Sequence, residues 1–155
     1  SLMNDTFPRQ VAQHGRRLVA GLDSLQPLAL LAARLTVAQA FFLSGLTKLR
    51  DWSTTLALFT DEYRVPLLPP ELAAVMGTAG ELVLPVLLVL GLGGRFAALG
   101  LSMVNVVAVL SLPDIAPAAL DQHVFWGSLL MAVLLWGPGR WSADAALQHR
   151  LSWLR

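Results

Sequence analysis

Long apolar stretches separated by short polar segments dominate the pattern of this chain. Four of them are long enough to cross a membrane, because about 20 helical residues at about 1.5 Å each span a hydrocarbon core of about 30 Å. We expect these spans at Leu28–Thr47, Leu72–Leu92, Phe96–Leu112 and Pro117–Trp136. The connections between them are short, which predicts an all-α integral membrane protein folded as an antiparallel four-helix bundle.

Three further segments have the pattern of helices that lie on a surface. Phe7–Gln26 carries an apolar stripe opposite several arginines, which is typical of an interfacial helix and, less often, of a helix that binds a soluble partner. The first connection, 48–70, repeats apolar and aromatic residues at helical spacing, namely Trp52, Leu56, Phe59 and Tyr63. After the last span, Ser142 can cap a final helix whose apolar stripe comprises Leu147, Leu151 and Leu154. We therefore divide the chain into an N-terminal surface segment, 1–27, a membrane domain, 28–140, and a C-terminal surface helix, 141–155.

Composition agrees with a membrane protein and excludes several other classes. Hydrophobic residues make up 55% of the chain and charged residues only 14%, against about 25% charged residues in soluble domains. A net charge of +1 gives no reason to expect a nucleic-acid partner. The absence of cysteine excludes thiol catalysis, disulfides and Cys-ligated metals, and no His or acidic residues have the spacing of a metal site.

The distribution of Lys and Arg predicts the orientation in the membrane. Most of these residues outside the spans lie in the N-terminal segment, the turn after the second span and the C-terminal segment. Because cytoplasmic loops are enriched in Lys and Arg, we expect both termini in the cytoplasm and the connections 48–70 and 113–122 outside.

Polar side chains inside the spans are the candidate functional residues: Arg34, Gln39, Glu81 and Asn105. Measured along each helix, the last three lie at similar depth and predict a polar layer near the membrane midplane. A lone charge there costs at least about 2.5–3.5 kcal/mol, so we expect Arg34 and Glu81 to pair across the interior. Pro85 adds a free acceptor, because it cannot donate to the carbonyl of Glu81. This layer either only locks the helices together or lets Glu81 handle a proton or a polar headgroup such as that of a quinone.

Two further residues stand near the outer ends of spans. Lys48 shares one helix face with Arg34 and Phe41, because they are separated by seven residues each, and this face should look into the bundle. Lys48 is interpreted as a snorkelling anchor or, alternatively, as part of an anion-binding site. His123, at the start of the fourth span, is interpreted as a cap or interface residue rather than a metal ligand.

Several short motifs, in this order and spacing, resemble the DoxX family of small bacterial membrane proteins over residues 28–147. They comprise Arg34, Ser44-Gly45-Leu46-Thr47-Lys48, Tyr63-Arg64-Val65-Pro66, Glu81 with Pro85, Gly91-Leu92-Gly93-Gly94-Arg95, and Gly137-Pro138-Gly139-Arg140-Trp141-Ser142-Ala143-Asp144. The resemblance implies a four-span fold in the bacterial inner membrane. It also implies a relation to DoxD-type subunits of thiosulfate:quinone oxidoreductase and a link to redox complexes.

These observations lead to a primary expectation and two alternatives. We expect an oxidoreductase subunit that couples a partner protein to the quinone pool, with Arg34 and Glu81 as its central pair and with Gln39, Asn105 and Lys48 at the headgroup. The chain has no cofactor motif of its own, so this activity needs a partner subunit. The alternatives are a non-catalytic membrane anchor or assembly factor, and a small-solute or metal transporter, which would need oligomerisation.

Overall fold

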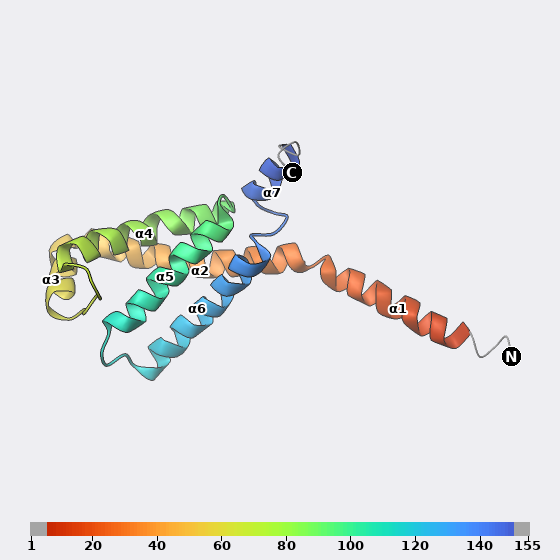
Figure 1. Cartoon of the computed structure of the whole chain (residues 1–155), viewed down its shortest axis with the longest axis horizontal. Helices are drawn as coiled ribbons and strands as arrows, with labels where there is room; N and C mark the ends of the chain where they lie inside the picture. The colour runs from red at the N-terminus through yellow and green to blue at the C-terminus, as the bar shows by residue number, and fades with distance from the viewer. Residues whose placement is uncertain (1–5, 151–155) are drawn as a thin grey trace.

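The computed structural model describes residues 6–150, and every regular element in that part is an α-helix. The helices follow one another along the chain with short connections (Figure 1). Their bounds are α1 Thr6–Asp23, α2 Gln26–Arg50, α3 Trp52–Asp61, α4 Pro70–Leu90, α5 Gly94–Ser111, α6 Pro117–Trp136 and α7 Ala143–Arg150.

Four stretches of the described chain are helical, long and apolar enough to cross a membrane. They are the continuous stretch Thr6–Arg50, which comprises α1 and α2, and the helices α4, α5 and α6. The predicted existence of four candidate spans is thereby confirmed. The predicted fourth span has the bounds of α6, whereas α2 continues three residues beyond the predicted Thr47.

Helices α2, α4, α5 and α6 pack side by side and form what we call the four-helix core (Figure 1). Its centre is a cluster of small and branched apolar residues from all four helices: Val37, Ala38, Phe41, Leu88, Ala97, Ala98, Leu101, Leu130 and Val133. Large apolar residues also cover the outside, and Val83, Met103 and Leu110 are each more than half exposed. An apolar exterior of this extent needs lipid around it, so this is a membrane protein.

Helices α2 and α4 approach each other closely at Gly45. A Cβ atom on this residue would lie 2.9 Å from Leu82 Cγ and 3.1 Å from Glu81 Cβ. Small residues allow helix backbones to approach closely in membranes, where dispersion contacts replace the hydrophobic effect as the source of association. Gly45 therefore determines how near α2 can come to the polar part of α4.

We expect Gly45→Ala to destabilise the protein by about 1–3 kcal/mol, the usual cost of overpacking a core. The matched control is Gly77→Ala, because a Cβ there would meet nothing nearer than Phe59 Cζ at 3.8 Å. Alanine has a higher helix propensity than glycine by about 1 kcal/mol, so the control should be neutral or stabilising. Unfolding by SDS in mixed micelles measures both changes, and equal midpoints for the two variants would contradict the close approach at Gly45.

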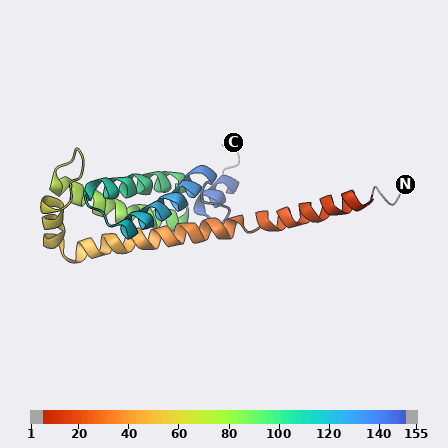
Figure 2. The ribbon, with the colours of Figure 1, turned by 90° about the horizontal axis from the view of Figure 1, so that it is seen from below.

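The remaining helices lie outside the four-helix core. α1 contains no buried residue and extends away from the core beyond the start of α2 (Figure 2). α3 crosses the opposite end, where Phe59 packs against Ala73 and Ala74 of α4. The Asp51 carboxylate caps α3 by accepting from Thr54 N at 3.1 Å, and hydrogen bonds from Thr54 and Ser53 lower the pKa of this carboxyl group.

The predicted cap of the last helix is confirmed. Ser142 Oγ accepts a hydrogen bond from Ala145 N at 3.2 Å and precedes α7 directly. Within the predicted apolar stripe, Leu147 lies in α7, whereas Leu151 and Leu154 lie outside the described residues. In the first connection the predicted helix is present as α3, and Tyr63 follows its end.

Candidate functional site

The predicted pair between Arg34 and Glu81 is wrong. The Arg34 side chain is fully buried, and its guanidinium donates to four backbone carbonyl groups instead of a carboxylate. Nε donates to Leu88 O at 2.8 Å and Nη2 donates to Val89 O at 2.6 Å. Nη1 donates to Pro138 O at 3.0 Å and to Trp141 O at 2.9 Å.

The physical reason lies in the end of α4. The last four carbonyl groups of a helix lack intrahelical donors and carry partial negative charge. A guanidinium offers five N–H groups in a planar fork, which matches several such oxygens at once. Arg34 thus fastens α2 to the end of α4 and to the segment that follows α6, and we call this arrangement the carbonyl clamp.

Two glycine-containing motifs meet beside the carbonyl clamp. Gly91 ends α4 in the left-handed region at φ 66°, and an added Cβ would collide with Ser142 and lie 2.9 Å from Arg34 Nη2. Gly91 O accepts from Asp144 N at 2.9 Å. The Asp144 carboxylate accepts from Gly93 N and Gly94 N, both at 2.7 Å, and so caps α5. The sequence analysis did not predict this cap, because Asp144 and Gly93 are 51 residues apart along the chain.

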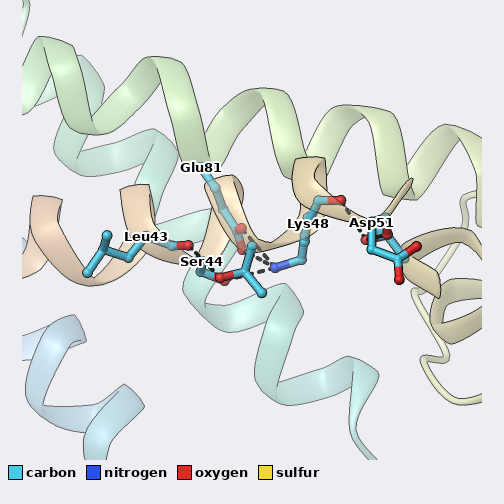
Figure 3. Close-up of polar contacts among 7 residues, drawn as sticks. Leu43, Ser44, Lys48, Asp51 and Glu81 are labelled. Carbon is cyan, nitrogen blue, oxygen red and sulfur yellow. Dashed lines mark hydrogen bonds and ion pairs between the residues drawn. The ribbon is translucent and has the colours of Figure 1, made fainter. Parts of the chain in front are cut away.

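The partner of Glu81 is Lys48, from the other end of α2 (Figure 3). Lys48 Nζ lies 2.8 Å from Glu81 Oε2 and 3.1 Å from Oε1, and it also donates to Ser44 Oγ at 2.9 Å. The two side chains are only 20% and 10% exposed. Lys48 therefore points inward to an anion and does not snorkel outward as an anchor.

Asn105 and His123 form a second polar pair, between α5 and α6. Asn105 Nδ2 donates to the His123 backbone carbonyl at 2.8 Å, which turns Oδ1 toward the imidazole at 2.7 Å from Nδ1. Because a carbonyl oxygen can only accept, Nδ1 carries a proton, and in the neutral imidazole Nε2 then keeps a free lone pair. The ring also packs edge-on against Trp126, with centroids 5.1 Å apart.

A cavity of about 500 Å³ connects these two polar pairs. Its polar lining groups are Ser44, Lys48, Tyr63, Glu81, Ser111 and His123, and the rest of its wall is mainly apolar or aromatic, including Phe41 and Trp126. Met76 of α4 and Met103 of α5 line it and are also more than half exposed. The cavity is therefore accessible from the lipid-facing side between α4 and α5.

Tyr63, which follows α3, contributes a phenol to this cavity. Its ring packs at right angles to Phe59, with centroids 4.9 Å apart. Burial, and then the negative charges of Glu62 and Glu81, raise the pKa of the Tyr63 hydroxyl. The group therefore stays protonated and can act as a hydrogen-bond donor.

The predicted site residues separate into three groups. Lys48 and Glu81 are in the cavity, and Asn105 is buried behind it and holds His123. Arg34 is in the carbonyl clamp, outside the cavity lining. Gln39 is exposed, so its placement in an interior polar layer is wrong.

Among the polar groups that line the cavity, sequence reasoning missed four: Ser44, Tyr63, Ser111 and His123. Ser44 precedes Lys48 by four residues, the spacing of neighbours on one helix face, and this signal could have identified it. His123 and Asn105 come from different helices, so no spacing along the chain predicts their contact.

Of three comparisons with known proteins, the one with protein-family models finds a match. No curated protein and no solved structure matches the chain. Within residues 6–150 no group of three or more His, Cys, Asp or Glu side chains could hold a metal ion. A family model described as DoxX matches residues 29–114, which is more than half of the chain. This match shows that the chain belongs to the DoxX family, and the apolar helices and the short motifs described above agree with it.

Proposed function

We propose that this protein is the membrane subunit of a bacterial redox system and that the cavity binds a quinone, through which a partner protein reaches the quinone pool. One observation carries the proposal. A buried ion pair, Lys48–Glu81, and an imidazole with a free lone pair, His123, line a mainly apolar cavity that is accessible from the lipid side.

The chemistry of the cavity fits the two parts of a quinone. Ligand cavities of about 300–1,000 Å³ lined mainly by apolar groups with a few polar ones are typical of small-molecule sites, and this one has about 500 Å³. Aromatic and aliphatic walls suit the ring and the start of the isoprenoid tail. The Tyr63 hydroxyl is a donor for a quinone carbonyl oxygen. The Lys48 ammonium, which already donates to Ser44 and Glu81, places a positive charge in the same cavity.

Reduction of a quinone takes up protons as well as electrons. Glu81 and His123 are the groups in the cavity that can hold or pass a proton, and Asn105 positions the imidazole. The sequence contains no cofactor motif, so the electrons come from a partner subunit. Arg34 acts through the carbonyl clamp as a positioning residue for the helices rather than at the headgroup.

The proposal also includes the topology of the helices and the side of the membrane on which the termini lie. We infer an antiparallel four-helix bundle in the inner membrane, with both termini in the cytoplasm and the α3 end of the core outside, because Lys and Arg are concentrated near the termini. Segments 1–27 and 141–155 are surface elements flanking the membrane domain, 28–140. Labelling single cysteines introduced at Thr60 and at His149 with an impermeant reagent in intact spheroplasts tests this orientation.

Quinone binding should be measurable through the intrinsic fluorescence of Trp126, which lines the cavity. We expect a short-chain ubiquinone or menaquinone analogue to quench it saturably in the wild type. Lys48→Met should weaken binding by about tenfold or more, because it removes the positive charge from the cavity, and polar interactions with a charged group are worth about 1.5–3 kcal/mol. The matched control is Gln39→Leu, at an exposed position of the same helix, which should bind normally. Equal affinity in all three proteins would contradict the site.

A second candidate function is that of a membrane anchor or assembly factor. It is favoured by α1, an amphipathic helix without any buried residue, which is available to the membrane surface, to a protein partner or to a second copy of the chain. Affinity purification separates the two functions. Bound quinone that is lost with Lys48→Met supports the first, and a stoichiometric protein partner that is lost on deletion of residues 1–23, without bound quinone, supports the second.

A further inference from the structure

A second cavity, of about 520 Å³, lies at the other end of the four-helix core, where α1 and α7 begin to leave it (Figure 1). It is lined by the start of α2, the start of α5 and the segment from Trp136 to Gln148. Two arginines line it, Arg95 and Arg140, and we call it the arginine pocket. It shares no residue with the proposed quinone cavity.

The donor groups of Arg95 and Arg140 are not used within the described part of the chain. Within residues 6–150 neither guanidinium forms a hydrogen bond or an ion pair with another residue. The carboxylate in the same pocket, Asp144, accepts from Gly93 N and Gly94 N and forms no hydrogen bond or ion pair with Arg95 or Arg140. Arg95 is the second residue of α5, where the helix dipole disfavours a cation. Within the described residues the fold therefore holds Arg95 at this place without a direct ion pair.

The surroundings of the pocket indicate the kind of anion. Phe96 and Trp136 line the pocket and are 66% and 71% exposed. They stand at the ends of α5 and α6, where aromatic residues in membrane proteins lie at headgroup level. A phosphate bound in the arginine pocket would thus have apolar helix surface beside it for acyl chains.

We propose that the arginine pocket binds the phosphate group of an anionic phospholipid, with Arg95 and Arg140 as its ligands. Guanidinium groups bind phosphate oxygens through charge-assisted hydrogen bonds, and basic pockets between membrane helices are typical sites for anionic headgroups. The proposal is independent of quinone binding. It assigns a role to Arg95 and Arg140, which the quinone cavity and the carbonyl clamp leave unused.

The test uses the full chain in detergent with short-chain phosphatidylglycerol as the probe. We expect phosphatidylglycerol to raise the thermal unfolding midpoint saturably, and phosphatidylcholine of equal chain length to raise it much less. The double variant Arg95→Gln/Arg140→Gln should weaken phosphatidylglycerol binding roughly tenfold or more. Its matched control is Arg50→Gln/Arg64→Gln, two exposed arginines outside the pocket, which should behave as wild type.

Three outcomes would overturn the proposal. Equal stabilisation of the wild type and of Arg95→Gln/Arg140→Gln would show that the pocket is not the site. Equal stabilisation by inorganic phosphate at the same concentration would indicate a site for a soluble anion instead of a lipid. Equal binding of phosphatidylcholine would show that the acyl chains, and not the charge, are recognised.

Discussion

Replacing Arg34 by methionine is expected to lower the free energy of unfolding by about 3–5 kcal/mol, the largest loss of any single substitution in this chain. The variant removes the guanidinium donor from four carbonyl groups, those of Leu88, Val89, Pro138 and Trp141, of which Leu88 O keeps a second donor in Gly91 N. Unsatisfied polar groups are costly where no water replaces the lost bonds. The measurement is the SDS unfolding midpoint of the purified protein, followed by circular dichroism.

Arg34→Lys distinguishes the geometry of the carbonyl clamp from its charge. Lysine keeps the positive charge but has three donors on one nitrogen, which cannot reach the end of α4 and the segment after α6 together. We expect this variant to lose most of the stability that Arg34→Met loses. Arg95→Lys, at an exposed position, is the matched control and should unfold like the wild type. A normal midpoint for Arg34→Lys would mean that charge alone holds the clamp.

The second large effect is expected at the Lys48–Glu81 pair. Lys48→Met leaves the Glu81 carboxylate nearly buried without its counter-charge, and removing one partner of a buried ion pair typically costs about 3–5 kcal/mol. Because the pair is partly exposed, we expect a loss near the lower end, about 3 kcal/mol. SDS unfolding measures this loss, and a change below about 1 kcal/mol, the usual value for surface pairs, would contradict it.

The double variant Lys48→Met/Glu81→Met separates stability from function. Two apolar side chains of similar size often replace a buried ion pair at little cost, so the double variant should recover most of the stability that Lys48→Met loses. It should nevertheless fail to bind the quinone analogue, because the charged groups at the headgroup are gone. A double variant that is stable and binds quinone normally would leave the ion pair with a structural role only.

Much of the architecture follows from the sequence alone. Apolar stretches of sufficient length predict the candidate spans because lipid demands continuous helices with their backbone groups paired internally. Periodicity also predicts the inward face of α2, on which Arg34 and Phe41 are buried and Lys48 is half-buried. The capping chemistry of Ser142 is local, and the structure confirms it.

Only the tertiary structure determines which positively charged side chain of α2 pairs with Glu81. Arg34 and Lys48 lie on the same face of α2, so periodicity allows either of them to face Glu81. The choice depends on how far α2 is shifted along α4, and that register depends on packing such as the contact of Gly45 with Glu81 and Leu82. It also depends on the competing attraction of the carbonyl groups at the end of α4 for Arg34. Both are contacts between helices, and the order of residues along one helix contains no information about the axial position of its neighbour.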